Sequence, residues 1–252
     1  MTIGRTFIPF MTFRELDHMR ESAEGDDSRH VSELIRENYR YIVVEGVIGA
    51  GKTTLARAIS ERLDGYLLLE EFEENPFLDT FYDDPKRWAF HTQLSFLASR
   101  YKQQKQLLSR DLFHQIVVSD YAFEKDRIFA NVNLEGDELR LHETIYSIME
   151  LNSPVPDTII YLQTSPGRLL KNIRTRGRPY EEHIDLTYLK TLIEAYNSYF
   201  FRYTRSPLLI VNTEDIDLVE DPGVVDGMLR EIATTRYRGT TYFRPARGGL
   251  FE

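Results

Sequence analysis

The chain has no cysteine, no long apolar run and a shortage of positive charge. The absence of cysteine excludes disulfides, thiolate metal sites and cysteine nucleophiles. No apolar run approaches the roughly 18 residues that would span a bilayer, and the N-terminus lacks an apolar signal core. A net charge of -9 opposes a nucleic-acid partner, although a local arginine cluster could still bind a small anion. We therefore expect a cytoplasmic protein without a membrane or nucleic-acid partner.

A glycine-rich stretch follows the apolar run Tyr41 to Glu45 and fits the pattern G-x-x-x-x-G-K-[ST]. Strand, glycine loop and helix in this order form the context in which the pattern binds a polyphosphate. Lys52 adds positive charge, the Thr53 hydroxyl can bind Mg²⁺, and the helix expected from Thr54 to Leu63 points its positive end at the anion. A plain glycine-rich turn is the less favoured alternative. The predicted ATP-binding residues here are Gly46, Val47, Ile48, Gly49, Ala50, Gly51, Lys52, Thr53 and Thr54.

Apolar runs that alternate with helical segments predict an α/β fold, in which a five-stranded parallel sheet has helices on both faces. We predict an N-terminal extension over 1–40, a P-loop domain over 41–235 and a C-terminal tail over 236–252. The expected strands are Tyr41 to Glu45, Tyr66 to Glu70, Gln115 to Ser119, Thr158 to Leu162 and Leu208 to Asn212. The expected helices include Thr54 to Leu63, Pro85 to about Arg110, Asp137 to about Asn152, Leu186 to Tyr203 and Pro222 to Thr234, with short ones at Thr12 to Met19 and His30 to Asn38.

Two carboxylates end strands that should flank the phosphate loop, Glu70 after the second strand and Asp120 after the third. In parallel sheets the ligand lies beyond the carboxyl ends of the strands. Glu70 could orient and deprotonate a substrate hydroxyl, and Asp120 could hold Mg²⁺ through water. The alternatives are a solvated acidic loop that includes Glu70 and a strand-end cap at Asp120.

Phosphoryl transfer also needs positive charge around the transferred group. Arg174, Arg176 and Arg178 surround Gly177, which is typical of an arginine-rich mobile lid that closes on phosphates. A solvated basic helix end is the alternative.

Gln93 and Arg100 are seven residues apart on the expected long helix and share a face with Phe96. A glutamine and an arginine beside an aromatic ring suit a flat heterocycle. A row of surface residues that binds no ligand explains the same pattern equally well.

The order of these motifs resembles the deoxyribonucleoside kinase family, and is closer to bacterial deoxyadenosine/deoxyguanosine kinases than to viral thymidine kinases. The similarity covers about Tyr41 to Asn212. The motifs that carry it are the glycine loop, Glu70-Glu71 with Asn75-Pro76-Phe77-Leu78, Phe81-Tyr82, Arg87-Trp88-Ala89-Phe90-His91-Thr92-Gln93, Asp126-Arg127 and Arg176-Gly177-Arg178.

This resemblance implies a P-loop kinase that uses ATP and Mg²⁺, and a homodimer in which the long helix packs against its copy. It implies that Glu70 is the base acting on the 5′-hydroxyl of a nucleoside and that a loop from Thr213 to Asp217 covers the adenine of ATP. The implied catalytic residues are Glu70, Lys52, Arg176 and Arg178, with Arg174 and Asp215 at the ATP and Thr53 and Asp120 at the metal. The implied substrate residues are Glu70, Tyr82 and Glu181 at the sugar, and Gln93, Phe96, Arg100 and Asp126 at the base.

One departure from the family concerns the charge near the transferred phosphate. The family usually has an acidic residue, arginine and serine after the third strand, whereas this chain has Asp120-Tyr121-Ala122. Tyr121 cannot replace a guanidinium, so either Arg127, Lys125 or a lid arginine supplies this charge, or catalysis is impaired.

The favoured function is ATP-dependent 5′-phosphorylation of a deoxyribonucleoside, namely deoxyadenosine or deoxyguanosine, with deoxycytidine as a further candidate. One alternative is a nucleoside monophosphate kinase of the thymidylate type. The other is a catalytically weak, nucleotide-binding structural or regulatory protein on the same scaffold.

Overall fold

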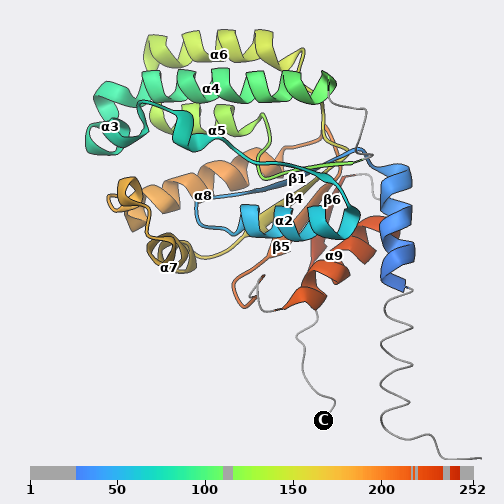
Figure 1. The fold of residues 1–252 in the computed structure, drawn as a ribbon. Coiled ribbons are helices and arrows are strands. Elements are labelled where there is room, and N and C mark those ends of the chain that lie inside the picture. The colour runs from blue at the N-terminus through green and yellow to red at the C-terminus, as the bar shows by residue number, and fades with distance from the viewer. Residues whose placement is uncertain (1–26, 110–115, 217, 219–220, 235–238, 245–252) are drawn as a thin grey trace, which may run out of the picture.

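The computed structural model describes residues 27–109, 116–216, 218, 221–234 and 239–244. Within these residues the centre is a sheet of six strands in the order β2-β3-β1-β4-β5-β6 (Figure 1). Every neighbouring pair is parallel, so the carboxyl ends of all strands lie at one edge. The strands are β1 (Tyr41–Gly46), β2 (Tyr66–Leu68), β3 (Val117–Ser119), β4 (Thr158–Gln163), β5 (Leu208–Asn212) and β6 (Thr240–Phe243).

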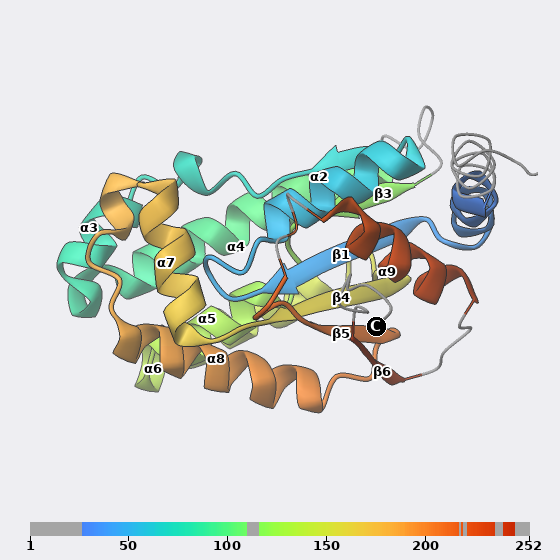
Figure 2. The same cartoon turned by 90° about the horizontal axis from the view of Figure 1, so that it is seen from below.

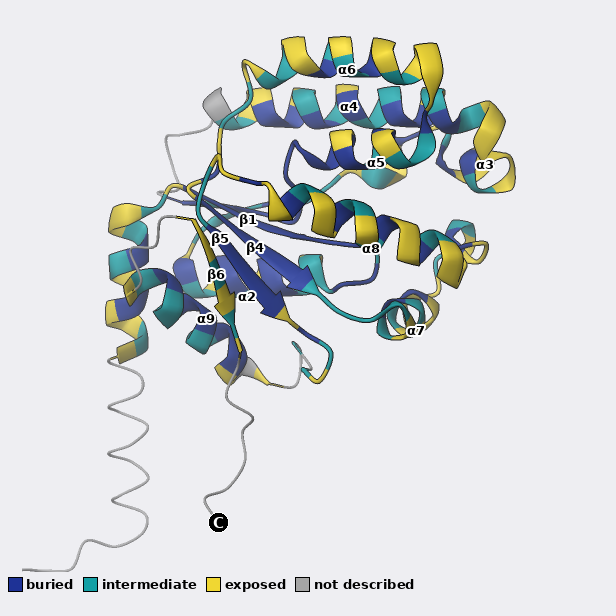
Figure 3. Cartoon of the chain, turned by 180° about the vertical axis from the view of Figure 1, so that it is seen from behind, coloured by how far each residue is buried: buried dark blue, intermediate teal, exposed yellow. Residues whose placement is uncertain are grey.

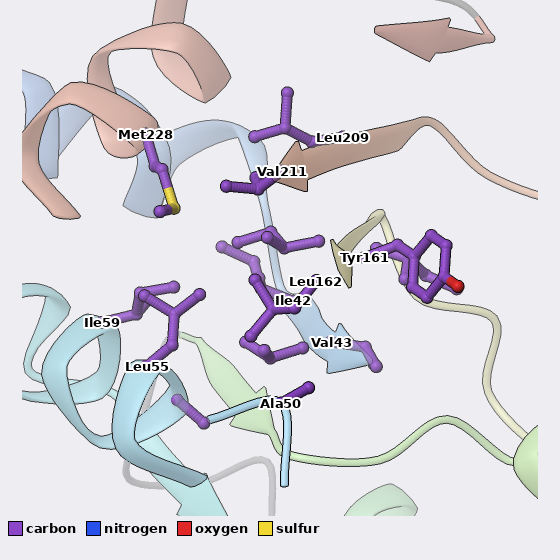
Figure 4. Packing of buried hydrophobic residues seen from close by; sticks show 14 of the residues in the cluster. Ile42, Val43, Ala50, Leu55, Ile59, Tyr161, Leu162, Leu209, Val211 and Met228 are labelled. Carbon is purple, nitrogen blue, oxygen red and sulfur yellow. The ribbon is translucent and has the colours of Figure 1, made fainter. Parts of the chain in front are cut away.

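β1 lies in the interior of the sheet, and all six of its residues are buried. A parallel strand that is covered on both faces must be apolar almost throughout. Ile42 and Val43 belong to the same packed core as Leu55 and Leu162 (Figure 4). The charged exception is Glu45, which lies directly before the glycine loop and is fully buried.

Helices cover both faces of the sheet, as Figures 1 and 2 show. α2 and α9 lie on one face, α4, α5 and α8 lie on the other, and α6 packs on α4 as an outer layer. α7 lies beyond the carboxyl ends of the strands (Figure 2). The predicted α/β fold with helices on both faces is confirmed. The bounds are α2 (Lys52–Leu63), α3 (Leu78–Asp83), α4 (Pro85–Ser109), α5 (Lys125–Asn133), α6 (Gly136–Glu150), α7 (Pro166–Arg176), α8 (Leu186–Phe201) and α9 (Pro222–Thr234).

The prediction of five strands was wrong by one, because β6 extends the sheet beside β5. Leu208 of β5 lies opposite Thr240, and Val211 lies opposite Phe243. The residues of β6 alternate between exposed and half-buried. They therefore lack the buried apolar run by which the other strands were predicted. β6 falls in the stretch 236–252 that we predicted as a tail; the domain boundaries themselves stay predictions.

Two helices, α3 and α5, formed where no helical period is visible in the sequence. The expected acidic loop after β2 contains a short 3₁₀ turn, Phe72–Glu74, and then α3. α5 follows β3 after five residues. Near the N-terminus a helix covers residues 27–38, while the other expected helix, Thr12 to Met19, lies outside the described residues. Over the part of the chain that is described, no helix has the length and hydrophobicity that crossing a bilayer would require.

Candidate active site

The glycine loop lies at the carboxyl end of β1 and packs against α7. Gly49 has φ of +84°, and a Cβ there would lie 2.8 Å from the carbonyl oxygen of Leu169, so only glycine fits. Lys52 donates from Nζ to the carbonyl oxygens of Gly46 at 2.8 Å and Val47 at 3.1 Å. Burial and then the neighbouring Lys125 lower the pKa of Lys52 to about 8. The loop thus offers the bend, the helix N-terminus and the cation that a polyphosphate requires.

Asp120 joins the glycine loop to the end of β2. The Thr53 hydroxyl donates to Asp120 Oδ2 at 2.5 Å, and the Glu70 backbone N–H donates to Asp120 Oδ1 at 2.8 Å. This is possible because β3 lies between β1 and β2, so the segments that follow the three strands meet at one edge. Asp120 therefore acts as a cap for the chain after β2 and also presents an oxygen beside Thr53.

Glu70 is turned inward, unlike its exposed neighbour Glu71. One carboxylate oxygen accepts from Arg100 Nε at 3.0 Å, and the other accepts from Lys125 Nζ at 2.5 Å. Burial alone would raise the pKa of Glu70, but Lys125 and Arg100 outweigh it and hold that pKa well below its usual range. Glu70 is thus an ionised carboxylate at neutral pH, as a base must be.

One cavity contains most of the predicted site residues. It reaches from the glycine loop past Glu70 to the middle of α4. The carboxylate of Glu70, the ammonium group of Lys52 and the amide of Gln93 therefore face one space. The predicted residues that line it are Ile48, Gly49, Lys52, Thr53, Glu70, Tyr82, Gln93, Phe96, Arg100, Asp120, Arg176, Arg178 and Glu181.

The far end of this cavity is formed by α4 and α5. Arg100 pairs with Asp126 and lies 4.8 Å over the ring of Phe96. Asp126 lies behind Arg100, fully buried and outside the cavity lining. Burial raises the pKa of Asp126 to about 7, although Arg100 opposes the rise. Among the described residues, Gln93 Oε1 and Asp126 Oδ2 are buried without a hydrogen-bond partner. Of these two residues only Gln93 lines the cavity, so its oxygen remains available to a ligand.

The arginine segment spans the end of α7, where Gly177 caps the helix with φ of +67°. Arg176 binds both carboxylate oxygens of Glu181, at 2.6 and 2.7 Å. The Arg178 guanidinium lies 3.9 Å over the ring of Phe72, which also lines the cavity. The arginines are thus joined to the wall of the cavity, and the alternative of a freely solvated helix end does not describe Arg176 or Arg178.

A second cavity lies on the other side of the glycine loop. It is lined by Gly51, Thr54, Arg168, Asn172, Thr213 and Ile216, among others. Arg168 was not predicted, and it donates to the Ile216 carbonyl oxygen at 3.2 Å. Arg174 and Asp215, both predicted at the ATP, line neither this cavity nor the first. Asp217, the end of the predicted adenine loop, lies outside the described residues.

Two buried charged residues, Glu45 and Lys125, were given no definite role from the sequence. Glu45 accepts from the backbone N–H groups of Gly46 at 2.9 Å and Ala122 at 2.7 Å. It therefore joins the glycine loop to the segment after β3. Lys125, the first residue of α5, contacts Glu70 directly. The sequence does hint at a role for Glu45, because it is a charged residue inside an apolar strand. For Lys125 the sequence shows only that it is one of several cations that could supply charge at the site.

A phosphate loop that shares a cavity with a buried carboxylate and lid arginines defines a P-loop kinase. The model of the family described as deoxynucleoside kinase matches residues 42–235, and the chain belongs to this family. The sequence-based expectation of a deoxynucleoside kinase is confirmed.

Several known proteins are similar to this chain. It is 41% identical over 157 residues to a deoxyguanosine kinase of Bacillus subtilis (strain 168), covering 62% of this chain and 76% of that one. It is 30% identical over 200 residues to a deoxyadenosine/deoxycytidine kinase of the same strain, covering 77% and 91%. The structure of a deoxyadenosine kinase from M. mycoides with bound dATP has a TM-score of 0.67 and 27% identity, covering 76% of this chain and 99% of that one.

Proposed function

We propose that this enzyme transfers the γ-phosphoryl group of ATP to the 5′-hydroxyl of deoxyadenosine or deoxyguanosine, with deoxycytidine as a further acceptor. The observation that carries the proposal is the single cavity that joins Glu70, Gln93 and Lys52. The names of the similar kinases include all three nucleosides, which supports this set of acceptors.

The chemistry of the far end of the cavity supports a base that both donates and accepts hydrogen bonds. The Gln93 amide has one donor group and one acceptor group, and its buried oxygen has no partner within the described part of the chain. The Watson–Crick edges of adenine, guanine and cytosine each offer a donor beside an acceptor, so an amide can meet them. Tyr82 and Glu181 line the same cavity nearer the lid, which suits contacts with the sugar 3′-hydroxyl.

The reaction needs a base and a loop for the phosphates. Glu70 would accept the proton of the 5′-hydroxyl while the 5′-oxygen attacks the γ-phosphorus and ADP leaves. Lys52 and the N-terminus of α2 would hold the outer phosphates of ATP. The second cavity, with Arg168 and Thr213, would receive the adenine of ATP. Arg176 and Arg178 would leave Glu181 and Phe72 to meet the transferred charge.

Mg²⁺ fits the oxygen atoms beside the glycine loop. The Thr53 hydroxyl and the Asp120 carboxylate are hard ligands, 2.5 Å apart. Within the described residues no group of three His, Cys, Asp or Glu side chains could hold a metal ion. Most ligands would therefore come from phosphates and water, as Mg²⁺ usually requires. Bound there, the ion would offset the charge of the phosphates.

We also propose a homodimer that forms through α4 and α6. Leu141, Ile148 and Leu151 lie at helical spacing on α6 and at its end, and their exposed fractions are 51%, 63% and 86%. Figure 3 shows exposed residues along the outer side of this helix. An exposed apolar stripe of this kind is typical of an association surface. The predicted cytoplasmic location stays a prediction.

The decisive experiment replaces the proposed base. Purified enzyme with ATP and Mg²⁺ should convert deoxyadenosine or deoxyguanosine to the monophosphate, as followed by chromatography. Glu70→Gln should lower kcat by about 10²- to 10⁴-fold and leave the nucleoside Kd, measured by calorimetry, nearly unchanged. Glu71→Gln is the matched control, because this exposed side chain belongs to the same acidic loop. Full activity in Glu70→Gln would show that Glu70 is not the base of the reaction.

A further inference from the structure

Lys125 is a buried cation that contacts the proposed base. Its side chain is 7% exposed, and Nζ lies 2.5 Å from Glu70 Oε2. It lines the same cavity as Lys52, Thr53 and Asp120. Its charge is felt at Lys52, whose pKa is lowered first by burial and then by Lys125. Lys125 therefore lies close to both the base and the phosphate loop.

The backbone places Lys125 in a costly position. It is the first residue of α5, where the positive end of the helix disfavours a cation. Burial adds a desolvation cost for the ammonium group. The carboxylate of Glu70 offsets both costs. The backbone fixes this position, because Glu45 binds the N–H of Ala122, and the carbonyl of Ala122 accepts from the N–H of Lys125 at 3.2 Å.

The other groups that could supply positive charge to the transferred phosphoryl group are less well placed than Lys125. Arg127 points away from the cavity, is 45% exposed and pairs with Glu143. Arg100 also contacts Glu70, but its guanidinium is shared between Glu70 and Asp126 at the far end of the cavity. Tyr121 is fully buried, and its hydroxyl has no partner among the described residues. A neutral phenol there cannot stabilise an anion as an ammonium group does.

We propose that Lys125 positions Glu70 for proton abstraction and then stabilises the phosphoryl group as it passes to the 5′-oxygen, an inference that rests on the proposed function. In this step the Glu70 carboxylate takes the 5′-hydroxyl proton, and the 5′-oxygen forms a bond to the γ-phosphorus. The bond from the γ-phosphorus to the bridging oxygen breaks, and its electron pair stays on ADP. Lys125 remains an ammonium ion and transfers no proton.

The test compares two cations on the same helix. Lys125→Met should lower kcat by about 100-fold, while the nucleoside Kd and both KM values change by less than about threefold, because the charge acts in the transition state. Lys125→Arg should recover much of the lost kcat, since it restores the cation. Arg127→Met is the matched control and should leave kcat within about twofold. Thermal melting of each variant checks folding.

Each result decides the inference. If the wild type is active and Lys125→Met has the same kcat, the role of Lys125 is overturned and the kinase function stands. A rise in KM with unchanged kcat would assign Lys125 to ground-state binding and overturn it as well. Should Lys125→Met fail to fold, Lys125→Gln takes its place, and loss of folded protein in both would show a purely structural role. A wild type that phosphorylates no deoxynucleoside would overturn the proposed function itself, and this inference with it.

Discussion

Arg100 connects the proposed base pocket to the proposed catalytic carboxylate. Its guanidinium pairs with Asp126 on one side and with Glu70 on the other. One cation thus serves two carboxylates in the interior, where removing one partner of a buried ion pair leaves the other charge uncompensated. Asp126 depends on this partner most, because it is completely buried.

Replacing Arg100 by Met should lower the free energy of unfolding by about 3–5 kcal/mol, as urea denaturation would measure. The difference in the free energy of unfolding between the wild type and this variant should shrink as pH falls. Burial already raises the folded-state pKa of Asp126 to about 7 from an ordinary 3.8, and loss of Arg100 raises it further. The penalty is therefore full above the folded-state pKa and is relieved as Asp126 takes a proton at lower pH.

The control for this prediction is Arg140→Met. Arg140 also pairs with an aspartate, Asp137, but both side chains are largely exposed. Exposed pairs add little to stability, so this variant should unfold close to the wild type at every pH. Equal deficits in the two variants would contradict the argument from burial.

At the level of helices, α7 supports the glycine loop, because the two pack closely at Gly49. Besides the Leu169 carbonyl, a Cβ at Gly49 would meet Ile173 Cγ1 at 3.0 Å. The α7 side chain Asn172 also donates to the Gly49 carbonyl oxygen at 2.8 Å. The helix that carries Arg176 therefore also holds the glycine loop in place.

Gly49→Ala should lower kcat/KM for ATP by about 100-fold, because the added methyl group pushes the loop away from α7 and displaces the phosphates. Gly136→Ala is the matched control: φ there is +58°, but no atom lies within 4 Å of the added Cβ. It should cost about 1 kcal/mol of stability through its backbone alone and leave the steady-state kinetics unchanged. Equal kinetics in both variants would show that the close packing does not matter.

For the whole molecule, the important surface is the outer layer in which α6 packs on α4 and exposes apolar side chains to solvent. α6 has buried residues toward the protein, among them His142 and Tyr146, and exposed apolar residues on its outer side. An isolated chain would keep this stripe in water. A second copy, related by a twofold axis, would cover it with the same surface.

The double variant Leu141→Glu with Ile148→Glu should therefore convert a dimer into a monomer, as light scattering after size-exclusion chromatography would detect. Two carboxylates in the centre of a symmetric interface would each face a like charge. Phe201→Glu is the control, since Phe201 is 86% exposed but lies on α8. A wild type that is monomeric at micromolar concentration would contradict the proposed dimer.

Local patterns were enough to predict much of this protein. The glycine loop, the start of α4 at Pro85 and β5 follow from features within a few residues of chain. Glu70 and Asp120 could be placed together because the ends of parallel strands share an edge. These predictions depend only on neighbours in sequence or on a general property of parallel sheets.

The rest required the tertiary structure. β6 has no buried apolar run that would predict a strand, and it is a strand because β5 offers an open edge of the sheet. The sequence by itself determined the phosphate loop and the α/β fold, since glycine spacing and apolar periodicity act locally. Only the packing of α5 against α4, α6 and α8 decided that Lys125, rather than Arg127, meets Glu70. Which of two nearby cations turns inward depends on the helix's orientation, and contacts distant in the sequence set that orientation.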